Sequence, residues 1–131
     1  MFSHIMIGSN DVARSKAFYD AIMKVLNYNA GVIDEKGRCM YFTPTGVLGL
    51  TKPIDDEEAS HGNGMTIGFL AESPEIVNEW HRVGLANGGV AIEQPPGVRG
   101  TGDRQLYLAY LRDPDGNKIC TTHFLPSDFV L

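Results

Sequence analysis

The sequence has few basic residues and no long apolar segment. Its 131 residues include 11 Lys and Arg against 16 Asp and Glu, and the formal net charge at pH 7 is −5. Nucleic-acid binding needs a clustered basic surface, so this composition argues against a nucleic-acid partner. No apolar run approaches the ~18 residues of a membrane-spanning helix, and the first residues lack the basic start of a secretory signal peptide. We therefore expect neither a nucleic acid nor a membrane among the partners.

Cysteine is also scarce. Cys39 and Cys120 are the only two cysteines, which is too few for a disulfide framework. We expect a cytoplasmic protein in which both thiols are reduced. With 43% apolar residues, a chain of this length can form one domain around a core of its own.

What the sequence does contain is one order of elements that occurs twice: a strand, a helix and three further strands. In the first half, apolar spacing and turn residues predict strands at 2–8, 31–34, 38–43 and 47–52, and a helix that begins after Asn10 and Asp11. In the second half they predict strands at 65–71, 92–94, 105–112 and 118–123, and a helix at 73–87. The duplication predicts an α+β domain of two tandem βαβββ repeats, residues 1–53 and 64–125, joined by the acidic linker 54–63.

The two repeats correspond to each other except at one loop. Phe18 of the first helix corresponds to Trp80 of the second, and Pro44 corresponds to Pro114. The glycine-rich loop 95–104 has no counterpart in the first repeat. It is either a cover over a site or a surface connection, because loops of this kind serve both purposes.

Alternation along the strands predicts which side chains face away from the helices. In the first strand, Ile5 and Ile7 should pack beneath the helix, which places His4 on the opposite face. In the second repeat, Met65, Ile67 and Phe69 should pack beneath the helix. Thr66 then lies on the opposite face, as His4 does.

The two predicted hairpins extend this assignment. The Asp-Pro-Asp-Gly turn at 113–116 pairs Tyr110 with Cys120 on the face away from the helix. If Pro44, Thr45 and Gly46 form the corresponding turn, Met40 pairs with Leu50, and Arg38 with Lys52. Two adjacent cations would suit an anionic ligand, although both could equally be solvated at the strand ends. A slip of one residue would invert these faces.

These residues resemble the vicinal oxygen chelate superfamily, which includes glyoxalase I, bleomycin-resistance proteins and extradiol dioxygenases. The resemblance is carried by His4 in the first strand, by GNGMTIGF at the start of the second repeat and by YLAYLRDPDGNKI near its end. It covers essentially the whole chain. It implies that the two sheets form a cupped cleft and that the protein is a homodimer.

The resemblance also implies four positions for the ligands of a divalent metal ion. These positions are His4, Leu50, Thr66 and Cys120, and only His4 is of the usual ligand type. Such a set is poor for Mg, Mn, Ni or Fe(II), which prefer nitrogen and oxygen donors. We expect no bound metal, and the alternative is a zinc ion held by His4, Cys120 and His61.

Three functions follow from the resemblance, in order of preference. The first is a glyoxalase-like lyase or isomerase acting on a small anionic metabolite. His4 would be its base, and the residues lining the ligand site would be Arg38, Lys52, Thr66 and Tyr110. The second is a metal-free protein that sequesters a small molecule in the cleft, as in the bleomycin-resistance branch. The third is an extradiol-type dioxygenase, which needs two histidines and a carboxylate around Fe(II).

Overall fold

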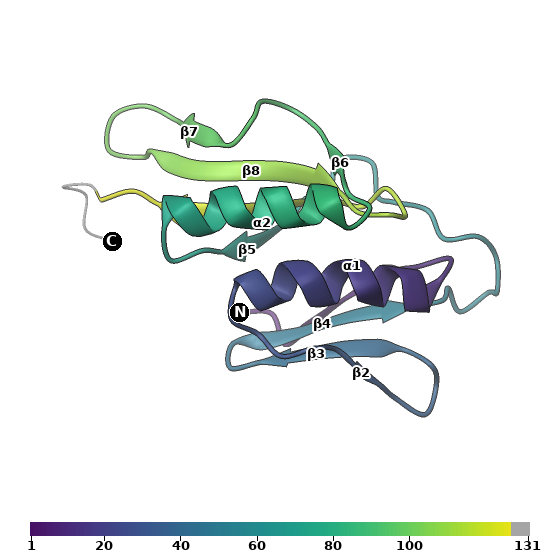
Figure 1. Cartoon of the computed structure of the whole chain (residues 1–131). Helices are drawn as coiled ribbons and strands as arrows, with labels where there is room; N and C mark the ends of the chain where they lie inside the picture. The colour runs from purple at the N-terminus through teal and green to yellow at the C-terminus, as the bar shows by residue number, and fades with distance from the viewer. Residues whose placement is uncertain (127–131) are drawn as a thin grey trace.

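The computed structural model describes residues 1–126, which form two helices and nine strands in two sheets (Figure 1). The first repeat contains β1 (His4–Gly8), α1 (Val12–Val25), β2 (Val32–Ile33), β3 (Cys39–Thr43) and β4 (Gly46–Thr51). The second contains β5 (Ile67–Leu70), α2 (Pro74–Ala86), β6 (Val90–Ala91), β7 (Gly97–Arg99), β8 (Leu106–Arg112) and β9 (Lys118–Phe124). No helix within this part of the chain is long and apolar enough to cross a membrane.

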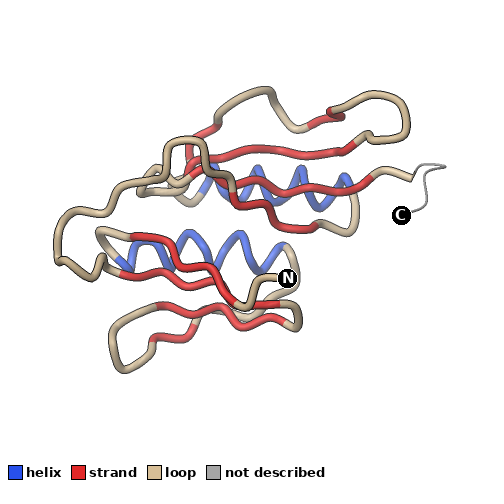
Figure 2. Tube along the Cα trace, turned by 180° about the vertical axis from the view of Figure 1, so that it is seen from behind, coloured by secondary structure: helices blue, strands red, loops and turns tan. Residues whose placement is uncertain are grey.

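The two sheets have the same strand order, which confirms the predicted duplication. The first sheet runs β1-β4-β3-β2, and the second runs β5-β9-β8-β6 with β7 also paired to β8. In each sheet the first strand of the repeat is parallel to the last, and the other pairs are antiparallel. Seen from behind, the strands lie in front of both helices (Figure 2). Both sheets therefore carry their helix on the same side and leave the other face uncovered.

Each helix begins at the cap that the sequence predicts. The Asp11 side chain accepts a hydrogen bond from the Arg14 backbone N–H at 3.0 Å. The Ser73 hydroxyl accepts one from the Ile76 backbone N–H at 3.2 Å, and Pro74 occupies the first turn, where no N–H is needed. Each cap satisfies a backbone donor that the helix itself cannot pair.

One apolar core joins the two repeats. Its buried residues come from both halves of the chain and include Phe18, Ile22 and Leu48 from the first, and Trp80 and Leu111 from the second. Gly84 of α2 lets the helix approach β8, because a Cβ at this position would collide with the Leu111 side chain. The packing of each repeat therefore depends on side chains of the other.

Most of the predicted strand faces are confirmed. Ile7 is buried in the core, and Ile5, Ile67 and Phe69 pack against it. The expectation for Met65 is wrong: β5 begins only at Ile67, and Met65 is 56% exposed.

The second hairpin has the predicted register, and the first does not. Tyr110 pairs with Cys120, as expected. In the first hairpin the turn has two residues, since Thr43 pairs with Gly46, and the Thr43 hydroxyl donates to the Gly46 carbonyl at 2.8 Å. The register therefore slips by one residue, and Leu50 pairs with Cys39. Leu50 consequently points into the core and is 1% exposed.

The segment between α2 and β8 also differs from the expectation. The strand predicted at 92–94 is wrong, because β6 spans Val90–Ala91 and ends before Glu93. Glu93 has φ 58°, a left-handed conformation that cannot continue a strand. The loop 95–104 contains β7, which pairs with β8. Arg99 holds this segment in place by donating to the carbonyls of Gln94 at 3.0 Å and Pro95 at 2.8 Å.

The turn between β8 and β9 binds the second repeat to α1 of the first. The Asp113 carboxylate is 3% exposed and accepts from the backbone N–H groups of Asp115 and Asn117, both at 2.9 Å. It also accepts from the Tyr19 hydroxyl at 2.6 Å. Burial, together with Asp113, raises the pKa of Tyr19 well above its ordinary value, so this hydroxyl stays protonated and donates. Asp115 adds further bonds between the repeats: it accepts from the Ser15 hydroxyl and the Arg14 side chain, both at 2.8 Å, and from the Asn10 backbone N–H at 3.0 Å.

Replacing Asp113 should destabilise the whole domain. An Asp113→Ala variant would leave the buried Tyr19 hydroxyl and two turn amides without their acceptor, at a cost of roughly 2–4 kcal/mol in the free energy of unfolding. Urea denaturation of the variant beside wild type measures this. The exposed Asp103→Ala is the control and should change the value by less than about 0.5 kcal/mol. Equal effects of the two substitutions would contradict the role assigned to Asp113.

Candidate functional site

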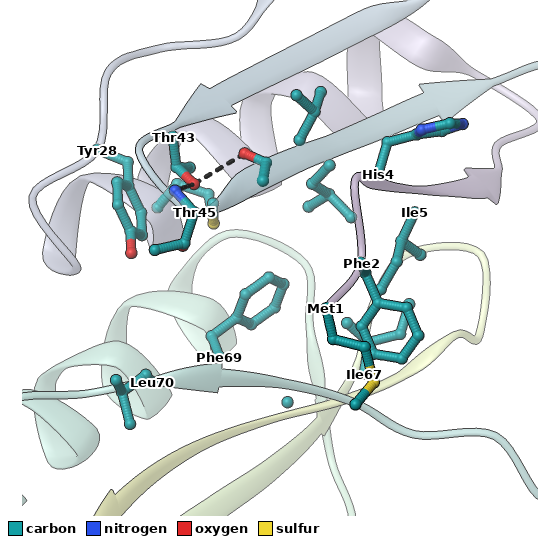
Figure 3. A pocket seen from close by; sticks show the side chains of 15 residues that line it. Met1, Phe2, His4, Ile5, Tyr28, Thr43, Thr45, Ile67, Phe69 and Leu70 are labelled. Carbon is teal, nitrogen blue, oxygen red and sulfur yellow. Dashed lines mark hydrogen bonds between the residues drawn. The ribbon is translucent and has the colours of Figure 1, made fainter.

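A pocket lies between the two repeats, where β1 and β4 approach β5 (Figure 3). Its volume is about 400 Å³, within the range of about 300–1,000 Å³ that is usual for small-molecule sites. Apolar side chains from both repeats line it, among them Phe2, Ile5, Ile67, Phe69 and Leu70. Within residues 1–126, β1 is paired only with β4 and β5 only with β9, so the edges of these two strands are not joined and leave room for the pocket.

The pocket has an aromatic wall and a small polar end. Phe69 is fixed by the buried Trp80 ring, whose centroid is 6.4 Å from its own. Tyr28, Thr43 and Thr45 lie together on one side of the pocket (Figure 3). The Thr43 hydroxyl is engaged with Gly46, whereas no residue within 1–126 bonds the Tyr28 hydroxyl.

The lining carries almost no charge. Among the described residues that line the pocket there is no Lys, Arg, Asp or Glu. Phe2 lines the pocket and is nevertheless 67% exposed, so it forms part of the rim. The arrangement is suited to holding an uncharged and largely apolar molecule, with the Tyr28 hydroxyl available for one hydrogen bond.

His4 lies on the predicted face and is one of the residues that line the pocket, at its edge. It is the first residue of β1, and its Nδ1 is 2.8 Å from the Ser3 hydroxyl. The imidazole is on the far side of the strand from Phe69 and Leu70 (Figure 3). The exposed ring therefore faces the uncovered side of the first sheet.

The structure does not bring Arg38 and Lys52 together, so their predicted pairing is wrong. The one-residue slip in the first hairpin removes it. Arg38 Nε is 2.7 Å from the Asp34 carboxylate, and Lys52 Nζ is 3.5 Å from that of Asp56. Neither cation lines the pocket. Each has an acidic neighbour four residues away that already compensates its charge.

Cys120 and Tyr110 share the uncovered face of the second sheet, as predicted. Cys120 is buried beside Gly68, where an added Cβ would lie 3.1 Å from the sulfur. Burial raises the pKa of Cys120, so the side chain is a neutral thiol at pH 7. Thr66 is exposed and precedes β5.

Sequence reasoning missed the charged group next to Tyr110. Lys118 Nζ is 4.8 Å from the centre of the Tyr110 ring and forms an ion pair with Glu93. The predicted hairpin register could have identified Lys118, because this residue is two positions before Cys120 and lies on the same face. It could not have identified Glu93, because residues 92–94 were expected to form a strand.

His61 is not near the other two residues proposed as metal ligands. It lies at the β8–β9 turn, where a Cβ on Gly116 would be 2.9 Å from its Nδ1. The Ala59 backbone holds the linker there. Its N–H donates to the Asn10 side-chain oxygen and its carbonyl accepts from the Asn10 side-chain amide, next to the end of β1. His4 is at the opposite end of that strand.

The residues at the family's metal positions do not fit a divalent ion. They offer one imidazole, a neutral buried thiol and a hydroxyl, while Leu50 points into the core. Within residues 1–126 no three His, Cys, Asp or Glu side chains are placed to hold a metal ion. A site for Zn or Fe(II) needs about three nitrogen, oxygen or thiolate donors.

Known proteins resemble this chain over nearly its whole length. Residues 1–121 match the Glyoxalase/Bleomycin resistance protein/Dioxygenase superfamily. A glyoxalase/bleomycin resistance protein from Albidiferax ferrireducens is 52% identical, with a TM-score of 0.90 over 94% of this chain and 98% of that one. A glyoxalase/bleomycin resistance protein/dioxygenase family enzyme from Burkholderia phytofirmans is 20% identical, with a TM-score of 0.73 over 94% of this chain and 98% of that one. At this identity the match shows only that the two proteins share a fold. No curated protein matches the sequence. The chain therefore belongs to the glyoxalase/bleomycin resistance protein/dioxygenase superfamily.

Proposed function

We propose that this protein binds a small, uncharged and largely apolar molecule in the pocket between its repeats, and that binding does not depend on a divalent metal. The observation that carries the proposal is the pocket of about 400 Å³, lined by apolar side chains of both repeats without Lys, Arg, Asp or Glu. Removing apolar surface from water would supply the binding free energy, about 25 cal/mol per Å². Sequestration of a compound is then the function that the geometry favours.

A lyase or isomerase acting on an anionic metabolite has less support. Arg38 and Lys52, expected to hold the anion, lie outside the pocket and already pair with acidic residues. His4, expected to act as the base, borders the pocket but directs its ring away from Phe69 and Leu70 (Figure 3). A general base must come within hydrogen-bond reach of the proton it removes. A ligand held against Phe69 and Leu70 would face away from that ring (Figure 3).

The pocket can be tested with N-phenyl-1-naphthylamine, an uncharged probe whose fluorescence rises in apolar surroundings. Wild-type protein should bind it, and Phe2→Ala should weaken binding about fivefold, because part of the apolar wall is removed. EDTA should leave the dissociation constant unchanged.

Phe42→Ala is the matched control for this experiment. Phe42 is 63% exposed, close to the 67% of Phe2, but it does not line the pocket. Its removal should leave the probe affinity unchanged. Loss of binding with Phe42→Ala but not with Phe2→Ala would place the probe on the open sheet face and contradict the proposal.

We also propose that the protein is a homodimer. Large apolar side chains are exposed on the sheet face away from the helices, including Phe42, Leu70 and Phe124. Exposed apolar surface of this kind is typical of a protein–protein interface.

Sedimentation at micromolar concentration should give twice the mass of the 14.3 kDa chain. Phe124→Asp should shift the equilibrium toward monomer, because a charge would be buried without a partner. The exposed Val90→Asp, at the β6 edge, serves as the control and should leave the mass unchanged. A wild-type protein that sediments as a monomer would rule out the dimer.

A further inference from the structure

Two methionines meet over a glycine on the uncovered face of the first sheet. Met6 on β1 and Met40 on β3 are both paired with Gly49 on β4, one from each side. A Cβ on Gly49 would collide with the Met6 sulfur and would lie 3.0 Å from the Met40 sulfur. The two sulfurs therefore share the space that a side chain at position 49 would occupy.

His4 supplies a nitrogen donor on the same strand as Met6. It precedes Met6 by two residues on β1, so both side chains project from the same face. When His4 Nδ1 donates to the Ser3 hydroxyl, Nε2 keeps its lone pair. The ring leans along β1 in the direction of the strand, the side on which Met6 follows (Figure 3).

We propose that Met6, Met40 and His4 bind a soft monovalent metal ion, Cu(I), through two thioether sulfurs and Nε2 of the imidazole. Thioethers are soft ligands that select Cu(I), and imidazole also suits copper. Thioethers do not titrate, so the sulfur ligands need no deprotonation. Hard divalent ions gain little from them, which is consistent with the poor fit of this chain to a site for such an ion.

The two sulfurs of this site lie outside the apolar pocket, whereas His4 borders it. Met6 and Met40 do not line the pocket, and they lie on the opposite face of the sheet from Ile5 and Leu48, which do. Methionines also fill gaps in ordinary packing. Packing alone predicts no preference for a soft ion, so metal binding separates the two explanations.

The experiment uses Ag(I), a soft ion of the same charge as Cu(I) that is stable in air, and protein labelled at the methionine methyl groups with ¹³C. One equivalent of Ag(I) should shift the methyl signals of Met6 and Met40. The signals of Met23 and Met65, two of the other methionines among the five in the chain, should stay in place. An equivalent of Mg²⁺ should shift none of them. If the Met6 and Met40 signals do not shift, the proposal is wrong, and this test requires no variant protein.

Calorimetric titration with Ag(I) then tests the ligand set. The double variant Met6→Leu/Met40→Leu conserves side-chain volume and should bind at least about tenfold more weakly, as should His4→Ala. Met65→Leu is the matched control and should bind as wild type does. A double leucine variant with wild-type affinity would place the ion elsewhere, for example on Cys120, and reject the site. His4→Ala with unchanged affinity would reject the three-ligand set.

Discussion

The Asp113 carboxylate, buried in the turn between β8 and β9, fixes how the two repeats sit against each other. A carboxylate that is almost entirely removed from water must receive hydrogen bonds, or its burial becomes very costly. Three donors come from its own turn, namely the backbone N–H groups of Asp115 and Asn117 and the Asn117 side-chain amide, and the fourth comes from Tyr19 on α1. This turn therefore holds the second repeat to the first, and the neighbouring Asp115 binds Arg14 and Ser15 of α1. The shared core then closes around Phe18 and Trp80.

Much of this fold could be predicted because it depends on local patterns. Each of these patterns involves residues that are close together in the sequence. They are the caps at Asp11 and Ser73, the periodic apolar residues of both helices and the Asp-Pro-Asp-Gly turn. The first hairpin could not be predicted in the same way. Its register depends on whether Gly46 belongs to the turn or to the strand, and the Thr43 hydroxyl decides this by bonding the Gly46 carbonyl. One residue of turn length inverts every side chain of β4.

The candidate site was less predictable, because it is made by contacts between distant segments. Phe2, Tyr28 and Phe69 are far apart in sequence, and nothing in their spacing shows that they border one pocket. The position of His61 depends on where the linker packs, and the sequence of the linker does not specify this. Leu50 was expected at a metal position, and the register sends it into the core instead. Correspondence with a family thus places the strands more reliably than the side chains they present.

The unjoined edges of β1 and β5 have a mechanical consequence. Within residues 1–126, no backbone hydrogen-bond ladder crosses from one sheet to the other, and the turn at Asp113 and the shared core hold the repeats together. A wider or narrower gap between the sheets would leave every strand pair intact, but it would require Phe18 and Trp80 to repack in that core. Close packing of side chains, rather than strand pairing, therefore sets the width of the pocket and the size of the molecule that fits in it.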